Sequence, residues 1–180
     1  MSRVPAIVIA GPGTNRDRDV AAALEMAGAN PRVVLADELI ATPTLLDEAR
    51  LAVVAGGFSY ADSLGAGRML ALDLTLGLGD RLHAFVESGR PLIGICNGFQ
   101  VLTRTKLLPG SLGHNAQGHF DCRWVVLDRV ATSNSIWMQG IDAPTHCPIA
   151  HGEGRYVHPD PRALEAVGQV ALRYRSTNPN

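Results

Sequence analysis

The sequence predicts an α/β fold with a flavodoxin-like, mostly parallel sheet flanked by helices. Short aliphatic runs alternate with helical segments along the first half of the chain, the order typical of a parallel sheet covered on both faces. The 180 residues suffice for one domain with a full core, and no linker, internal repeat or low-complexity tract divides them. We therefore expect a single domain over residues 1–180.

Aliphatic runs and glycine breaks locate the elements of the first half. Each predicted strand is short and is closed by glycine or by a helical pattern. The expected strands are residues 4–10, 32–35, 51–55 and 91–95, and the expected helices are residues 17–27, residues 66–87 and a segment from Gly98 onward. Gly77 and Gly79 are expected to weaken the centre of the second helix, because glycine is a poor helix former.

The second half of the chain has a different pattern. Pro159 and Pro161 mark a turn before a short helix around residues 162–166. The expected strands are residues 123–129, 147–150 and 169–174.

Composition argues against several classes of function. Sixteen basic and seventeen acidic residues give a formal net charge of −1, whereas nucleic-acid binding rests on clustered positive charge. No apolar stretch approaches the roughly 20 residues that span a bilayer, and the N-terminus lacks a signal pattern. The three cysteines form no CxxC pair, which favours reduced thiols, and no spacing predicts a metal site. We expect a cytoplasmic protein.

Residues 94–100, with the sequence GICNGFQ, carry the most informative chemical pattern. A predicted strand enters this segment, a predicted helix leaves it, and Cys96 has a glycine two residues before and two residues after it. Glycine lacks Cβ, so the backbone can bend tightly and the thiol can project from the sheet edge. The N-terminal end of the following helix favours thiolate, and the Asn97 amide is placed to stabilise an oxyanion. The pattern predicts that Cys96 is a nucleophile for acyl transfer.

Two further features bear on this prediction. A lone cysteine is more often a buried structural residue, and we expect Cys122 and Cys147, which lack the glycine setting, to be core thiols. Gly56 and Gly57 follow another predicted strand, where paired glycines let backbone amides approach a ligand closely. Gly57 could supply a second oxyanion donor, although glycines at such strand ends are often only turns.

Several motifs recur together in one known family. They are Gly13-Thr14-Asn15, GGFSY at residues 56–60, GICNGFQ at residues 94–100, CRWV at residues 122–125, AHGEGRY at residues 150–156 and Asn178-Pro179-Asn180. In this order they resemble the glutaminase components of phosphoribosylformylglycinamidine synthases, which are class I glutamine amidotransferases. The cysteine turn alone indicates only the class I superfamily, whereas GGFSY and AHGEGRY select the purine-pathway branch.

The resemblance implies a reaction, its partners and a set of site residues. Cys96 attacks glutamine to give a glutamyl thioester and ammonia, and water then releases glutamate. Ammonia passes to a large synthetase subunit, which is expected to bind ATP and magnesium, and a small accessory subunit is also expected. No cofactor is expected in this chain. Gly57 and Asn97 match the family's oxyanion-hole positions, and Gln100, Asn115 and Phe120 fall in segments that line the glutamine pocket.

The resemblance also implies a base that this sequence lacks. In this family a histidine and a glutamate two residues apart, in a Pro-His-Pro-Glu motif, follow an Asn-Pro-Asn-Gly-Ser segment. The sequence stops at Asn180, inside that segment, so we expect a truncated C-terminus and little activity from this chain alone. His151, two residues before Glu153, is an alternative base, although the resemblance places both in a loop near the active site and the subunit interface.

Two other functions stay open on the sequence alone. One is a binding subunit with the same fold that keeps the cysteine but does not hydrolyse glutamine. The other is a different cysteine-dependent hydrolase, or a chaperone-like protein, on the same flavodoxin-type sheet. Glutamate release, with Cys96→Ala as a control, separates these alternatives from a glutaminase.

Overall fold

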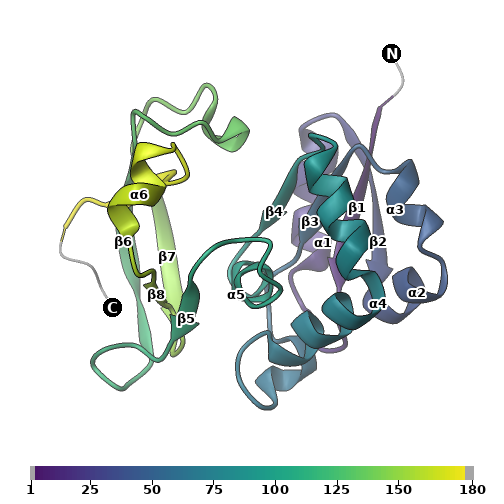
Figure 1. The fold of residues 1–180 in the computed structure, drawn as a ribbon, viewed down its shortest axis with the longest axis horizontal. Helices are drawn as coiled ribbons and strands as arrows, with labels where there is room; N and C mark the ends of the chain where they lie inside the picture. The colour runs from purple at the N-terminus through teal and green to yellow at the C-terminus, as the bar shows by residue number, and fades with distance from the viewer. Residues whose placement is uncertain (1–2, 177–180) are drawn as a thin grey trace. The chain divides into compact units, whose positions relative to one another are not determined.

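The computed structural model describes residues 3–176, and contacts within the chain divide it into two compact units (Figure 1). The first unit is Met1–Pro109 and the second is Gly110–Asn180. Each unit contains its own sheet or sheets. The assignment of residues 1–180 to a single domain stays a prediction. Asn178, Pro179 and Asn180, the last of the recurring motifs, lie outside the described residues.

The sheet of the first unit is fully parallel and confirms the predicted α/β class. Its strand order is β2-β1-β3-β4. The strands are β1 (Val4–Ala10), β2 (Ala29–Leu35), β3 (Leu51–Val54) and β4 (Leu92–Gly94). All four predicted runs form strands, and β2 begins three residues earlier than its aliphatic run, at Ala29, which pairs with Val4. Because the strands are parallel, the carboxyl ends of β3 and β4 lie at one edge.

Helices flank this sheet, as the alternating pattern predicts (Figure 1). The helices of the first unit are α1 (Asp17–Met26), α2 (Ala36–Ala41), α3 (Thr44–Glu48), α4 (Arg68–Glu87) and α5 (Asn97–Arg104), with a 3-10 turn, η1, at Ser59–Asp62. The sequence pattern did not reveal α2 and α3, which have six and five residues, because so few turns give no clear helical period.

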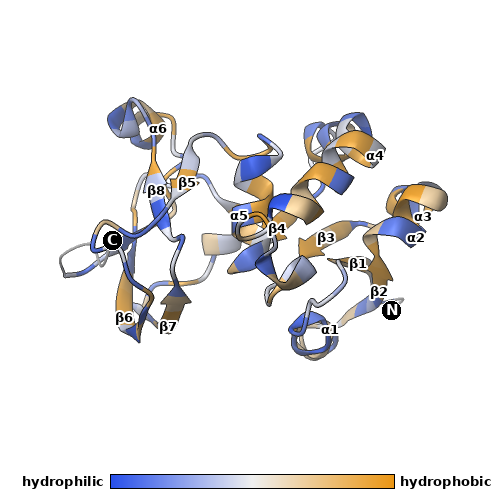
Figure 2. Cartoon of the chain, turned by 90° about the horizontal axis from the view of Figure 1, so that it is seen from below, coloured by the Kyte–Doolittle hydropathy of each residue, from blue (hydrophilic) through white to orange (hydrophobic). Residues whose placement is uncertain are grey.

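The core of the first unit lies between α4 and the sheet. Four leucines spaced four residues apart share one face of α4, and each is at most 2% exposed. They are Leu70, Leu74, Leu78 and Leu82. They belong to the same buried cluster as Ile9 and Val54 of the central strands. The apolar strands and helix faces of this unit are coloured orange in Figure 2.

Gly77 has a packing role in α4. The helix runs unbroken from Arg68 to Glu87, which confirms the predicted helix, and the expected weakening of its centre by glycine stays a prediction. A Cβ placed on Gly77 would lie 2.5 Å from the Cγ1 atom of Ile40, a side chain of α2. The absence of a side chain at this position therefore allows α2 to pack directly against α4.

The second unit is built from antiparallel strands. Its three-stranded sheet has the order β7-β6-β9, and β5 pairs with β8. The elements are β5 (Ser111–Gly113), β6 (Asp121–Arg129), η2 (Ile136–Met138), β7 (Thr145–His151), β8 (Arg155–Val157), α6 (Pro161–Ala166) and β9 (Leu172–Tyr174). The predicted helix is confirmed as α6, whose first N–H groups are capped by the Asp160 side chain, which accepts from Ala163 N–H at 3.0 Å.

The prediction that Cys122 is a core thiol is wrong, because its side chain is exposed. Cys147 lies opposite Val125 in the β6–β7 ladder, and Cys122 lies three positions from Val125. Since successive side chains of a strand alternate between the two faces, Cys122 and Cys147 lie on opposite faces of the sheet. Cys147 is half-buried, and burial raises the pKa of its thiol. None of the helices among residues 3–176 is long and apolar enough to cross a bilayer.

Candidate active site

The turn between β4 and α5 holds Cys96 in a strained backbone conformation. Its φ is 56° and its ψ is −112°, a combination that residues with a Cβ rarely adopt. The residue is exposed, and α5 begins directly after it. This is the strand–turn–helix geometry that presents a nucleophile.

The two glycines around Cys96 are required by the close approach of α5 to the sheet. A Cβ on Gly98 would overlap the carbonyl group of Val54, in the neighbouring strand β3. A Cβ on Gly94 would overlap the carbonyl group of Gly98 itself. Both overlaps are with backbone atoms, which cannot move aside as a flexible side chain can. The spacing therefore reflects close packing of the first turn of α5 on β3 and β4.

Gly56 lies beside Cys96, and Gly57 lies against the segment that contains Asn15. A Cβ on Gly56 would be 3.3 Å from the Cβ of Cys96. Gly57 has φ of 124°, forms an isolated bridge with Thr14, and has the backbone and side chain of Asn15 where its own Cβ would be. The GTN and GGF motifs thus meet at the edge of the sheet where Cys96 is exposed.

A buried hydrogen-bond cluster surrounds the side chain of Asn97. Its Oδ1 accepts from the Ser59 hydroxyl at 2.5 Å. Its Nδ2 donates to Asp62 Oδ1 at 3.2 Å and to Gln100 Oε1 at 3.1 Å. Ser59 and Asn97 are each 2% exposed and Gln100 is 9% exposed. The sequence interpretation placed Asn97 and Gln100 at the site but assigned no catalytic or glutamine-binding role to Ser59 or Asp62.

The loop that carries Ser59 and Asp62 is itself strained. Tyr60, Ala61 and Asp62 have consecutive φ values of 54°, 50° and 53°, in the left-handed region that costs roughly 1–2 kcal/mol for each residue with a Cβ. Contacts with the rest of the unit hold this loop. The Tyr60 N–H donates to Pro12 O at 2.6 Å. The Tyr60 hydroxyl donates to Asp73, and this hydrogen bond, aided by burial, raises the pKa of Tyr60 to about 12.

In the second unit, Asn115 organises the segment His151-Gly152-Glu153-Gly154, called here the HGEG loop. The Asn115 side chain is 3% exposed. Its Nδ2 donates to His119 O at 3.0 Å and to His151 O at 2.8 Å. Its Oδ1 accepts from Gly154 N–H at 3.1 Å and lies 3.0 Å from His151 Nδ1. The Asn115 amide is therefore committed to protein groups, while Phe120, also expected at the glutamine pocket, is 58% exposed.

The surroundings of His151 favour the neutral form of its imidazole. Because Asn115 Oδ1 is an acceptor, Nδ1 of His151 carries the hydrogen, and Nε2 is left as the basic nitrogen. Burial lowers the pKa of His151, and the nearby negative charge of Asp121 offsets part of that effect. The ring also packs on Gly154, where a Cβ would overlap it.

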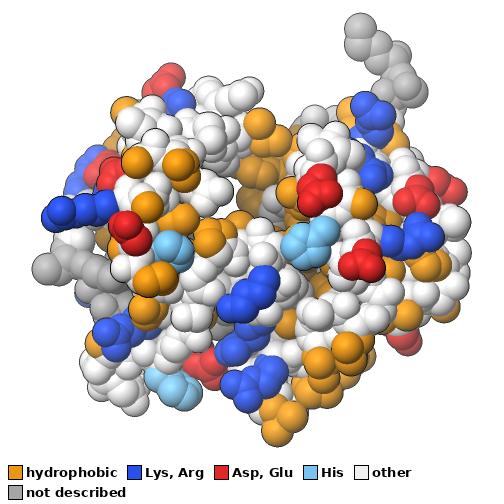
Figure 3. All heavy atoms as spheres, viewed as in Figure 1, with side chains coloured by type: hydrophobic (Ala, Val, Ile, Leu, Met, Phe, Trp, Pro, Cys, Tyr) orange, Lys and Arg blue, Asp and Glu red, His pale blue; other side chains and the backbone are white. Residues whose placement is uncertain are grey.

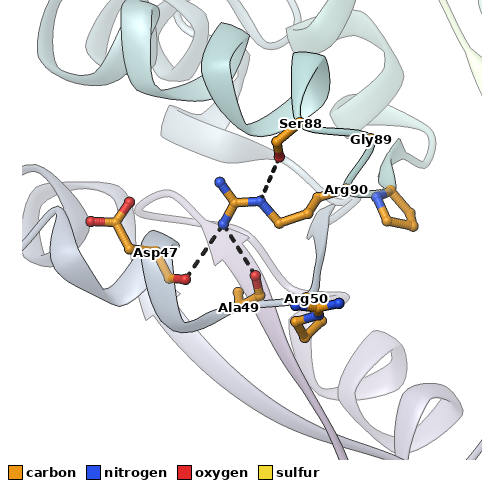
Figure 4. A pocket seen from close by; sticks show the side chains of 7 residues that line it. Asp47, Ala49, Arg50, Ser88, Gly89 and Arg90 are labelled. Atoms are coloured by element: carbon orange, nitrogen blue, oxygen red, sulfur yellow. Dashed lines mark hydrogen bonds between the residues drawn. The ribbon is translucent and has the colours of Figure 1, made fainter.

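A cavity of about 490 Å³ lies at the opposite edge of the first sheet, where β3 and β4 begin (Figure 4). Arg90 lines it, and the guanidinium donates to Ser88 Oγ at 2.8 Å and to the carbonyl oxygens of Leu46 and Ala49 at 3.1 and 3.3 Å. It also stacks 4.1 Å from the ring centre of Phe85. Arg90 therefore ties the end of α3 to the end of α4, and the cavity lies far from Cys96.

On the face seen in Figure 3, acidic and basic side chains both occur on each unit, and several basic side chains gather in the lower middle of the view. Within residues 3–176, no group of three or more His, Cys, Asp or Glu side chains is arranged to hold a metal ion.

Comparison with known proteins shows which family the chain resembles. Residues 3–180 match the CobB/CobQ-like glutamine amidotransferase domain. The chain belongs to this family. Among the relatives of this amidotransferase domain is the phosphoribosylformylglycinamidine synthase subunit PurQ of Treponema denticola, which is 42% identical over 94% of this chain and 70% of the relative. The PurQ subunit of Dehalococcoides mccartyi is 43% identical over 94% of this chain and 69% of the relative.

A solved structure is similar over almost the same length. The structure of PurLQS from Thermotoga maritima aligns with a TM-score of 0.77 and 35% sequence identity, covering 97% of this amidotransferase domain and 76% of that chain. The fold class inferred from the sequence and the resemblance to the purine-pathway branch are both confirmed.

Proposed function

We propose that this chain is the glutaminase component of a phosphoribosylformylglycinamidine synthase and supplies ammonia for de novo purine biosynthesis. Membership of the amidotransferase family supports the reaction class. Relatives that are 42% and 43% identical and carry the PurQ name support the pathway. The observation that carries the proposal is Cys96, exposed at a strained turn beside Gly56 and Gly57.

The proposed reaction is acyl transfer through Cys96. The thiolate attacks the carboxamide carbon of glutamine, a C–S bond forms, and the carbonyl oxygen becomes an oxyanion. As the first residue of α5, Asn97 has an N–H without an intrahelical acceptor, and this group with the Gly57 N–H stabilises the oxyanion. The C–N bond then breaks, the nitrogen takes up a proton and leaves as ammonia, and water later cleaves the thioester to glutamate.

The glutamine pocket is proposed to include Gln100, Asn115 and Phe120. The position of Gln100 in the first turn of α5, where its side chain accepts from Asn97, supports its place in the pocket. Asn115 acts by holding the HGEG loop in place. His151, whose Nε2 is the basic nitrogen, is the alternative base within the sequence.

The proposed partners are the large synthetase subunit, which receives the ammonia and binds ATP and magnesium, and a small accessory subunit. The similar solved structure is named as a PurLQS assembly, which supports association with other subunits. This chain is proposed to hold no cofactor of its own and to work in the cytoplasm.

The test is glutamine hydrolysis by the complete gene product combined with its synthetase subunit. We expect glutamate release by the wild type, loss of at least about 10⁴-fold in Cys96→Ala, and little change in Cys122→Ala. An electrophilic glutamine analogue should form an adduct on Cys96, located by mass spectrometry.

Two results would contradict the proposal. Activity retained by Cys96→Ala would show that Cys96 is not the nucleophile. Hydrolysis of another substrate, with no glutamine hydrolysis and no adduct, would favour a different cysteine-dependent hydrolase on this fold.

A further inference from the structure

The buried cluster around Asn97 carries an inference that rests on the proposed function and deepens it. Asp62 has a carboxylate, which only accepts hydrogen bonds, so the nitrogen of the Asn97 amide faces Asp62. The oxygen of the amide then faces Ser59, and the Ser59 hydroxyl must be the donor. The direction of every hydrogen bond in the cluster is therefore fixed by one charged group.

The Asn97 side chain is saturated by these contacts. Its oxygen accepts one hydrogen bond, and its two N–H groups donate to Asp62 and Gln100. Among the described residues, Ser59 is the donor to its oxygen, at 2.5 Å and across 38 residues of sequence. Because Ser59 and Asn97 are both 2% exposed, water does not replace the hydroxyl if it is removed.

Asn97 also has the backbone group that matters for the chemistry. It follows the strained Cys96 and is the first residue of α5, so its N–H has no acceptor within the helix. An oxyanion donor works only when its N–H lies within about 2.7–3.1 Å of the developing charge. A side chain locked on three partners fixes the residue that carries this donor.

We propose that Ser59 is a positioning residue that holds Asn97 and thereby orients the oxyanion donor next to Cys96. Because Ser59 is 2% exposed and donates to Asn97, its proposed role is exerted through Asn97. Its loop is kept in the left-handed conformation by Tyr60, which is bonded to Pro12 and Asp73, so the hydroxyl is presented from a braced segment.

The test uses the complete gene product with its synthetase subunit and two variants, Ser59→Ala and Ser59→Cys. The cysteine variant keeps the volume but donates only weakly, so it separates the hydrogen bond from packing. Removing an oxyanion donor typically costs 10²–10³ in kcat, and a misplaced donor should cost about 10-fold or more. We expect this loss in kcat for both variants, with KM for glutamine changed less than about 3-fold.

A second measurement separates positioning from damage to the thiol. Alkylation of Cys96 by iodoacetamide forms no oxyanion, so its rate should stay within about 2-fold of wild type, while single-turnover thioester formation falls about 10-fold. Ser88→Ala, which removes a hydroxyl at the far end of α4, is the control and should leave both rates unchanged.

Three outcomes would overturn the assignment, and they are distinguishable. Wild-type kcat in both Ser59 variants would remove the positioning role while leaving the proposed function intact. Parallel loss of alkylation and acylation would show that the hydroxyl supports the whole turn rather than the donor. A wild-type complex that releases no glutamate would overturn the proposed function itself, and this inference with it.

Discussion

The turn at Cys96 and the HGEG loop are both rich in glycine, yet different forces hold them. At Cys96 the backbone is strained, and Gly94 and Gly98 have other backbone atoms where a Cβ would be. The HGEG loop is held from outside by a single buried amide, that of Asn115, which binds the carbonyl of His151 and the N–H of Gly154. One segment is shaped by close approach of main chains, the other by side-chain hydrogen bonds.

The difference teaches what a glycine-rich motif can mean. A strained residue costs of order 1–3 kcal/mol, which persists only where the surrounding structure enforces it. The strained turn exposes the thiol of Cys96. The HGEG loop, in contrast, belongs to a satisfied hydrogen-bonding network of the kind that stabilises a fold. Substitutions should therefore affect the two segments in different ways.

The largest expected effect comes from replacing Cys96 with glycine and with alanine. Both variants should lose at least about 10⁴-fold in glutamine hydrolysis, because both lack the proposed nucleophile. Only Cys96→Gly relieves the strain of a φ of 56°, whereas glycine also increases the entropy of the unfolded chain. With both effects included, the free energy of unfolding of Cys96→Gly should be about 1 kcal/mol higher than that of Cys96→Ala. Chemical denaturation followed by circular dichroism measures this difference. Equal stability of the two variants would show that the turn stores no strain.

The next largest effect is the difference in stability between glycine-to-alanine variants of the two segments. Gly98→Ala should destabilise the first unit by at least about 3 kcal/mol, since the new Cβ overlaps the Val54 carbonyl and backbone must shift. Gly152→Ala is the matched control in the HGEG loop, where the nearest atom to the new Cβ, on Phe120, is 3.9 Å away. Its effect should stay below about 1 kcal/mol. Similar losses in thermal unfolding would remove the contrast between the segments.

The third largest effect should come from removing the Asn115 amide, which holds the HGEG loop. Asn115→Ala removes a buried amide, leaves several partly buried groups without their hydrogen bonds, and should cost about 2–3 kcal/mol. Asn134→Ala, in the same unit, removes an exposed amide with one hydrogen bond, to Val167 O, and should cost less than about 1 kcal/mol. Both tryptophans, Trp124 and Trp137, lie in this unit, so their fluorescence in urea reports its unfolding. Equal costs would show that Asn115 does not organise the loop.

The two segments also show how far the sequence could predict the structure. The strands around Cys96 are continuous aliphatic runs, and the glycines two residues either side of it are local signals of close approach, so the turn was predictable. The contact between Ser59 and Asn97 spans 38 residues and has no local signature. The same holds for Asn115 and the HGEG loop, which are 36 residues apart.

Short elements were missed for a related reason. β5 and β8 have three residues each, too few for an alternating pattern, and their pairing is defined only in three dimensions. Cys122 was misplaced because the sequence identifies β6 but not which face of its sheet is covered.

A smaller effect tests whether a glycine in a regular helix follows the same rule of close approach. Gly77→Ala should destabilise by about 1–2 kcal/mol, because Ile40 must move. Gly79→Ala, two residues on in α4, meets nothing within 4 Å and should stabilise by about 0.5–1 kcal/mol. Thermal unfolding of the two single variants measures the opposite signs. A gain at Gly77 would show that α2 does not pack tightly there.

The smallest effect is a pH dependence confined to the HGEG loop. Burial places the pKa of His151 below its ordinary value of about 6.5, so the unfolded chain takes up a proton that the folded chain does not. The stabilisation from a neutral His151 is complete above pH 6.5 and declines as the pH falls through the folded pKa. Tryptophan fluorescence in urea at pH 7.5 and 5.5 should show lower stability at the lower pH. His151→Asn keeps a donor for Asn115 without a titrating group and should reduce this dependence, whereas His146→Gln, an exposed histidine of β7, should retain it. An unchanged pH dependence in His151→Asn would show that the buried imidazole of His151 is not its source.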